Sequence, residues 1–252
     1  MRLTVLGNAG GYLAPLSGGS SYLVESGGVR VLLDCGGGAR EALAARGVAR
    51  VDALVLSHFH HDHVLDFMTI RDAFPEGMPI VVPRGEAGKL QAMADAFAFR
   101  AAYAPPGPLL EEAQLEVGPL RLTFAPTRHS APSMATRIED DEGTLVYASD
   151  SAPCSTLADL ARGADWLLMH ALLPDVAPGS GHAQRHSTAR TAGRLAAEAG
   201  AGTLLISHRH HSSADADMLR EAAASHPRVE LARTGASYLI RPEGGRPSGR
   251  PR

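Results

Sequence analysis

The sequence is poor in cysteine and has no long apolar run, and each shortage excludes a class of protein. Its 252 residues include two cysteines, Cys35 and Cys154, which are too few for a disulfide framework or a thiolate metal cluster. No apolar stretch approaches the length that spans a bilayer, and the N-terminal residues contain no long apolar segment typical of a secretion signal. We therefore expect a cytoplasmic, reduced protein with no membrane partner.

The sequence also lacks a strong excess of positive charge. The formal net charge is −3, and the segment 241–252 holds four arginines and one glutamate, so the rest of the chain carries −6. Because phosphate contacts dominate nucleic-acid affinity, a nucleic-acid binder normally has a basic face. The charge balance therefore gives no strong nucleic-acid signature.

What the chain does have is enough apolar sequence for one sizeable core. Apolar residues make up 44% and charged residues 20% of the chain, which is typical of a globular α/β enzyme domain. We expect a single domain over residues 1–240. The Arg/Pro/Gly-rich tail 241–252 is expected to be disordered.

The most informative stretch is Ser57-His58-Phe59-His60-His61-Asp62-His63, which directly follows the apolar run 52–56. That run is typical of a short buried strand, so the potential ligands lie at a strand end. In an extended turn, His58 and His60 point the same way and can share one metal. Asp62 and His63 lie past the bend, where they can reach a second metal.

Imidazole and carboxylate groups are ligands that Zn²⁺ accepts, and a catalytic site leaves one position open for water. Two metals a few ångströms apart can bridge one hydroxide and hold both the attacking and the leaving oxygen. The stretch thus predicts a dinuclear hydrolase site. A His-rich tract can also bind metal adventitiously, although four ligands in this order after a strand favour a built site.

Apolar patterns and turn residues predict the other elements. Strands are expected at 2–6, 20–25, 29–33, 80–82, 115–124, 134–139, 144–148, 164–169, 203–206, 228–231 and 237–240, and helices at 40–46, 64–74, 86–99, 156–162, 189–199 and 218–224. Single polar residues follow several of these strands, namely Asp34, His129, Asp150, His170 and His208. Taken alone, each aspartate fits a helix cap or turn as well as a functional site.

Together these residues resemble the metallo-β-lactamase fold superfamily, whose hallmark is His-x-His-x-Asp-His. The resemblance extends from Leu6-Gly7-Asn8-Ala9-Gly10-Gly11 to Ile206-Ser207-His208, and it is strongest to the branch of tRNase Z and small phosphodiesterases. It implies an α/β fold, a four-layer αββα sandwich. It also implies that the glycine-rich loop near the N-terminus lines one wall of the active-site groove.

The resemblance implies two divalent metal ions, with Zn²⁺ as the first expectation and Mn²⁺ or Fe²⁺ as alternatives. The first metal would be held by His58, His60 and His129, the second by Asp62, His63 and His208, with Asp150 bridging both. An acid at the position of Asp34 would orient a ligating histidine.

Two residues are expected to be catalytic, Asp62 and His186. In the resembled branch, a histidine in a His-Ser/Met-Thr motif stabilises the leaving alkoxide, and His186-Ser187-Thr188 matches it. The alternative is a residue that merely precedes a helix cap. The branch has an acidic residue after the histidine at the place of His170, whereas this chain has Ala171. Any hydrogen-bond relay that positions His186 would then have to use His170 or Asp175 instead.

A long tRNA-gripping arm often lies between the third histidine and the bridging aspartate in true tRNase Z enzymes, but only residues 130–149 are available here. With the acidic body, this favours a small-molecule substrate such as a cyclic phosphodiester. The alternatives are a lactone, thioester or other acyl-ester hydrolase with the same dinuclear site, and a metal-binding protein without catalysis. The resembled branch also suggests a homodimer.

Overall fold

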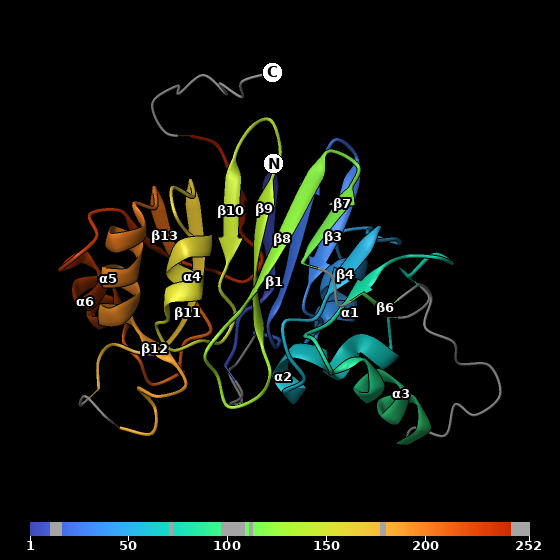
Figure 1. The fold of residues 1–252 in the computed structure, drawn as a ribbon, viewed down its shortest axis with the longest axis horizontal. Coiled ribbons are helices and arrows are strands. Elements are labelled where there is room, and N and C mark those ends of the chain that lie inside the picture. Colours follow the sequence, from blue (N-terminus) through green and yellow to red (C-terminus); the bar gives the residue numbers. More distant parts are fainter. Residues whose placement is uncertain (11–16, 71–72, 97–108, 111–112, 177–179, 243–252) are drawn as a thin grey trace.

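Two β-sheets pack face to face in the computed structural model, which describes residues 1–10, 17–70, 73–96, 109–110, 113–176 and 180–242 (Figure 1). The first sheet has the order β15 (Ser237–Leu239), β1 (Arg2–Gly7), β2 (Ser21–Ser26), β3 (Val29–Leu33), β4 (Ala53–Val55), β5 (Ile80–Val81) and β6 (Leu109–Leu110). The second has the order β14 (Val229–Leu231), β13 (Thr203–Ser207), β11 (Trp166–Leu173), β10 (Thr144–Tyr147), β9 (Met134–Glu139), β8 (Leu120–Pro126) and β7 (Gln114–Val117), and β12 (Ser187–Thr188) pairs with β11.

Helices lie outside both sheets (Figure 1). On the first sheet these are α1 (Ala39–Ala44), α2 (His61–Val64), the 3₁₀ turn η1 (Leu65–Met68) and α3 (Ala87–Ala96). On the second they are α4 (Ser155–Leu160), α5 (Ala189–Ala199) and α6 (Asp215–Ala223). The predicted αββα sandwich is therefore confirmed.

Consecutive apolar residues along the strands point to opposite faces of each sheet, and this explains the layers. Leu3, Val5 and Tyr22 belong to a buried cluster between the sheets, whereas Leu23 and Leu32 on the opposite strand faces belong to the cluster under α1 and α2. A third cluster lies between the second sheet and its helices. Both faces of each sheet are covered, as expected for strands with nearly continuous apolar runs.

Some predicted boundaries were wrong. The helix expected over 64–74 is replaced by α2, which ends at Val64, and by η1. The backbone N–H of Asp66 donates to Cys35 O, and the Asp66 carboxylate accepts from the backbone of Gly38 and Arg40, so contacts to the preceding loop replace a continued helix. The strand expected to stop at Met169 continues, with His170 inside β11.

Parts of several expected segments fall outside the described residues: positions 71–72 of the 64–74 helix, the end of the 86–99 helix beyond residue 96, and the tail from residue 243. Both cysteine thiols are free, with Cys35 buried. Among the helices of the described ranges, none has the length and apolar character needed to cross a membrane.

Candidate metal centre

The predicted metal ligands come together at one edge of the sandwich, where several strands end. His58 and His60 follow β4, and Asp62 and His63 belong to α2. The other ligand candidates lie in or after strands of the second sheet: His129 after β8, Asp150 after β10, His170 within β11 and His208 after β13.

The His-rich turn adopts a bend at His60. His60 is extended, with φ −71° and ψ 148°, and forms the N-cap of α2, which begins at His61. The extended portion predicted for His58 to His60 is thus present. Asp62 and His63 lie past the bend as predicted, but in a helical turn.

Two glycines allow the surrounding backbone to hold this turn. Ser20 N donates to Asp62 O at 2.8 Å. A Cβ atom on Gly19 would lie 2.5 Å from that same oxygen, and one on Gly36 would lie 2.1 Å from it. Because both distances are far below van der Waals contact, only glycine fits at these positions. The glycine-rich loop, where it is described, therefore supports the α2 turn.

Four side chains form an outer group, which we define as His58, His60, His129 and Asp150; one potential ligand atom from each lies within 4.8 Å of the others. His60 Nδ1 lies 3.1 Å from His58 Nε2 and 3.1 Å from His129 Nε2. Asp150 Oδ2 faces this group, at 4.0 Å from His58 Nε2 and 3.7 Å from His129 Nε2. Three imidazole nitrogens thus converge beside one carboxylate oxygen.

An inner group, which we define as His63, Asp150, His170 and His208, meets the same 4.8 Å limit. Here the other oxygen of Asp150, Oδ1, lies 3.9 Å from His63 Nε2 and 3.4 Å from His208 Nε2. Asp62 Oδ2 lies 3.8 Å from His63 Nε2 and 3.6 Å from His208 Nε2. The carboxylate of Asp150 therefore presents one oxygen to each group.

The ring nitrogens remote from this centre have protein partners. His63 Nδ1 is 2.7 Å from Asp34 Oδ2, and His208 Nδ1 is 2.9 Å from Ser20 Oγ. His129 Nδ1 donates to the carbonyl oxygen of Arg185 at 2.9 Å. A proton on Nδ1 leaves the Nε2 lone pair directed at the centre, which is the arrangement that metal-ligating histidines adopt.

Asp34 is buried and accepts several hydrogen bonds. Ser57 N donates to its Oδ1 at 2.6 Å, and Tyr147 Oη donates to its Oδ2 at 2.5 Å. Burial raises the pKa of Asp34 above its usual value. Of the two interpretations open from the sequence, contact with a candidate ligand fits and helix capping does not, because the N-cap of α1 is Gly38.

His170 belongs to the inner group, although its sequence context predicted neither a metal ligand nor a partner of Asp150. Its Nδ1 lies 2.8 Å from Asp150 Oδ1 and its Nε2 3.0 Å from Tyr22 Oη, while its ring stacks on that of His208 at 4.4 Å. The sequence feature that could have indicated a role for His170 was its place after an apolar run, a feature that His208 shares. Tyr22, on a distant strand, gave no such signal.

The electrostatics of the centre suit a cation. Burial lowers the pKa of His58 well below its usual value and lowers the pKa of His63 to about 3. Burial alone would raise the pKa of Asp150, but His208, the hydrogen bond from His170 and His63 together hold that pKa well below its usual range. At neutral pH, His58 and His63 are therefore uncharged imidazoles beside an ionised carboxylate, the protonation states that metal binding requires.

One buried nitrogen atom without a hydrogen-bond partner tests whether these residues fit a metal ion. His63 Nε2 is buried and has no hydrogen-bond partner among the described residues. Such an atom is costly in a folded protein unless something else takes its lone pair. Its neighbours are carboxylate oxygens and other imidazoles, a donor set that suits Zn²⁺ or Fe²⁺. The residues therefore fit a bound cation.

His186 lies beside the outer group. Its Nδ1 is 3.7 Å from Asp150 Oδ2, and its ring centroid is 4.8 Å from that of His129. Burial lowers the pKa of His186 to about 4. The N-cap of α5 is Thr188, so His186 also stands just before a helix cap, as the alternative from the sequence expected.

The two residues suggested for a relay to His186 have other partners. Ala171 is buried in β11 and pairs with Ser187. Of the two suggested substitutes, His170 contacts Asp150, and Asp175 pairs with Arg190. The ring that stacks on His186 is that of His182, at 5.1 Å between centroids and 20° between planes.

Comparison with known proteins identifies the family. A model described as the beta-lactamase superfamily domain matches residues 29–209. The chain belongs to this superfamily. Among proteins of this superfamily, YhfI of Bacillus subtilis, named a probable metallo-hydrolase, is 32% identical over 93% of this chain and 98% of its own length. Ribonuclease Z of Mycobacterium bovis is 32% identical over 82% of this chain and 85% of its own length.

The crystal structure of YhfI, a metallo-β-lactamase fold protein, superimposes with a TM-score of 0.81 at 29% identity, covering 94% of this chain and 98% of YhfI. The predicted family is thus confirmed. Together with the histidine and aspartate groups, these relatives identify the chain as a metal-dependent hydrolase of the superfamily.

Proposed function

We propose that the chain is a dinuclear metal-dependent phosphodiesterase that acts on a small, for example cyclic, phosphodiester. The observation that carries this proposal is the carboxylate of Asp150, which directs Oδ2 to His58 and His129 and Oδ1 to His63 and His208. A carboxylate placed in this way can bridge two cations. The predicted ligands would hold Zn²⁺ at both positions, with Mn²⁺ or Fe²⁺ as alternatives.

When bound, two such cations would lower the pKa of a coordinated water and polarise the scissile phosphoryl oxygen. Asp62 would complete the ligand set formed by His63 and His208, since its Oδ2 lies 3.8 and 3.6 Å from their Nε2 atoms. Its carboxylate can also accept a hydrogen bond from the attacking water. Loss of Asp62 would therefore impair both cation binding and water orientation.

We assign stabilisation of the leaving oxygen to His186. With a pKa lowered to about 4 by burial, His186 is neutral at pH 7 and carries one ring N–H that can donate to a departing alkoxide. Stacking on His182 limits rotation of the His186 ring. This contact would take over the positioning that an acidic residue at the place of Ala171 would otherwise provide.

Three further observations support a small phosphodiester. Residues 134–147 form the compact hairpin of β9 and β10, so the segment that often carries an arm in tRNase Z enzymes is short here. The body of the chain is acidic. A diphosphatase of the PhnP family has the same fold, with a TM-score of 0.75 at 20% identity, and both that name and ribonuclease Z denote hydrolysis at phosphorus.

The test is hydrolysis of bis(4-nitrophenyl) phosphate by the metal-loaded protein beside three variants. We expect turnover by the unmodified protein, a loss of about 10³-fold or more in Asp62→Ala, and a loss of about 10²-fold in His186→Ala with little change in KM. His211→Ala, at an exposed position, should retain activity. Absence of turnover by unmodified protein with two bound metals would contradict the proposal and direct the search to lactones and thioesters.

A further inference from the structure

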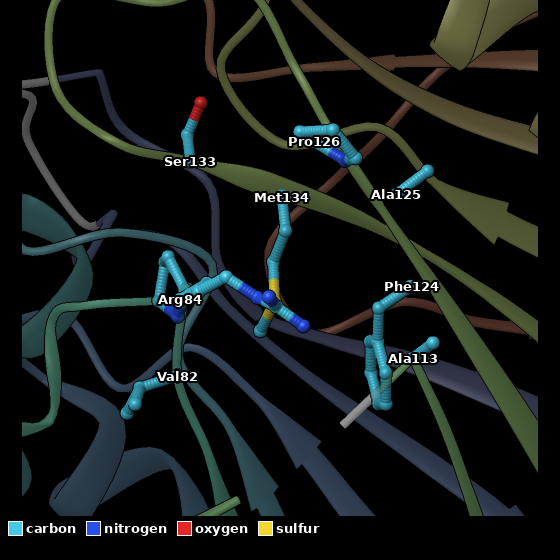
Figure 2. A pocket seen from close by; sticks show the side chains of 9 residues that line it. Val82, Arg84, Ala113, Phe124, Ala125, Pro126, Ser133 and Met134 are labelled. Carbon is cyan, nitrogen blue, oxygen red and sulfur yellow. The ribbon is translucent and has the colours of Figure 1, made fainter. Parts of the chain in front are cut away.

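An apolar pocket lies beside the outer group, and the chemistry described above does not use it. Its volume is about 270 Å³, and its walls include Val82, Arg84, Ala113, Phe124, Pro126 and Met134 (Figure 2). We call it the Phe124 pocket. Apart from Arg84 and one serine, the lining is apolar.

Backbone contacts connect the walls of this pocket to the metal centre. Met134 N, on a lining residue, donates to Ser57 O at 3.0 Å, and Leu56 N donates at 2.9 Å to the carbonyl oxygen of Val81, which directly precedes the lining residue Val82. His129 lies in the loop between Pro126 and Ser133, which are both lining residues. The pocket is therefore adjacent to the segments that carry two ligands of the outer group.

The positive charge of Arg84 has no acidic counterpart among the residues that line the pocket. Arg84 is the only charged lining residue, and no hydrogen bond or ion pair of its side chain occurs within the described part of the chain. Glu86, the nearest acid in the sequence, pairs with Lys89. The hydroxyl of Ser133 is 2.5 Å from Thr127 Oγ1. In Figure 2 the Arg84 side chain extends over the pocket, so its guanidinium can meet an anion there.

The volume restricts what the apolar part can hold. A dry apolar cavity of about 150 Å³ already accommodates benzene. Sites for drug-sized ligands begin at about 300 Å³. At about 270 Å³, the Phe124 pocket accommodates one phenyl ring or a branched aliphatic group with its linking atoms. The complementary ligand is thus a compact apolar group attached to an anion.

We propose that the Phe124 pocket is a substrate subsite that binds a compact apolar ester group of the phosphodiester, with Arg84 contacting an anionic oxygen of the same molecule. The identity of this ligand as the substrate rests on the proposed function. The pocket would hold the ester group that stays on phosphorus, while His186 faces the outer group from the α5 side. The substrate would therefore be a phosphodiester with one compact aromatic or branched aliphatic group.

The first experiment compares phenyl 4-nitrophenyl phosphate with methyl 4-nitrophenyl phosphate on the metal-loaded protein, because the two diesters share a leaving group. We expect kcat/KM to favour the phenyl diester by at least about tenfold. Ala113→Trp fills the pocket from an exposed position and should bring this ratio close to one. Arg84→Met should raise KM for the phenyl diester by about tenfold, and Arg84→Lys by less. Arg162→Met, at an exposed arginine paired with Asp159, is the matched control and should leave the ratio unchanged.

The second experiment does not depend on turnover. Binding of 4-toluenesulfonate, an apolar anion, is measured by calorimetry on the same metal-loaded proteins. We expect binding to the unmodified protein and to Arg162→Met, and at least about tenfold weaker binding to Ala113→Trp and Arg84→Met. Equal binding by all four proteins, or none by the unmodified protein, would overturn the subsite.

The two experiments separate the two proposals. If toluenesulfonate binding depends on Ala113 and Arg84 while neither diester is hydrolysed, the subsite stands and the phosphodiesterase function fails. If both diesters are hydrolysed with a ratio that Ala113→Trp does not change, the function stands and the subsite is wrong.

Discussion

The two ligand groups share Asp150 but differ in how they are held. In the inner group every residue is buried, and buried side chains at the ends of β3 and β2 contact its rings, namely Asp34 on His63 and Ser20 on His208. In the outer group His60 is partly exposed, and His129 is oriented by the backbone of a loop. The inner group is thus preorganised by the fold, whereas the outer group is the more exposed of the two. Substitutions at Asp150, which both groups share, and at residues that serve one group alone should therefore distinguish the roles of the two groups.

The largest effect is expected from Asp150→Ala, because this residue belongs to both groups. Turnover should fall by at least about 10³-fold, equivalent to about 4 kcal/mol of lost stabilisation. Bound metal, measured by elemental analysis, should fall below two ions per chain. Asp159→Ala, at an exposed acid that pairs with Arg162, is the control and should retain both properties. Retention of two ions by Asp150→Ala would refute a bridging role.

The next effect concerns the pH dependence of stability in chelator-treated protein. The pKa of His63 is about 3 in the folded state, against about 6.5 in an unfolded chain. Between these values the unfolded chain binds more protons, so the stability present above pH 6.5 is lost as the pH falls toward 3. From pH 7 to pH 4 the free energy of unfolding should fall by up to about 3 kcal/mol through His63.

Urea unfolding at several pH values measures this dependence. His63→Gln should flatten it, and His211→Gln, at an exposed histidine, should not. Identical slopes for His63→Gln and the parent protein would mean that the inner group does not determine the acid sensitivity.

A smaller effect is expected from Asp34→Asn, which removes the charge behind His63 but keeps the shape. Asparagine tolerates the left-handed backbone of this position, where φ is 55°. Loss of such an orienting carboxylate typically weakens metal affinity by about 10–100-fold. Competition with a chromophoric chelator should detect one weakened site of two. Asp66→Asn, which alters a half-buried acid that accepts hydrogen bonds from loop backbone, should leave both sites unchanged.

The sequence predicted the parts of the centre that are local in the chain. His58, His60, Asp62 and His63 stand within one turn, and their residue types are sufficient to indicate metal chemistry. Elements with strong periodicity were also predicted well, and the helix expected at 189–199 has those same bounds in the structure. Local sequence is informative where one segment alone determines the geometry.

The remaining parts depend on contacts between distant segments, which one sequence does not reveal. His170 contacts Tyr22 across the two sheets, and nothing in either segment indicates the other. The helix predicted over 64–74 failed for the same reason, since the backbone of Asp66 bonds to Cys35 O. The Phe124 pocket likewise combines the segment after β5 with β8 and β9. Tertiary contacts decided these features.

The hydrogen bond between Ser20 and His208 joins positions 188 residues apart, and it has a consequence for biosynthesis. A nascent chain exposes the His-rich turn long before β13 is made, so the early imidazoles lack Asp150 and His208. The inner group forms only after nearly the whole chain has left the ribosome. If the centre holds two metals as proposed, its complete loading follows synthesis, and an ion captured earlier would be released or rearranged as the second sheet folds.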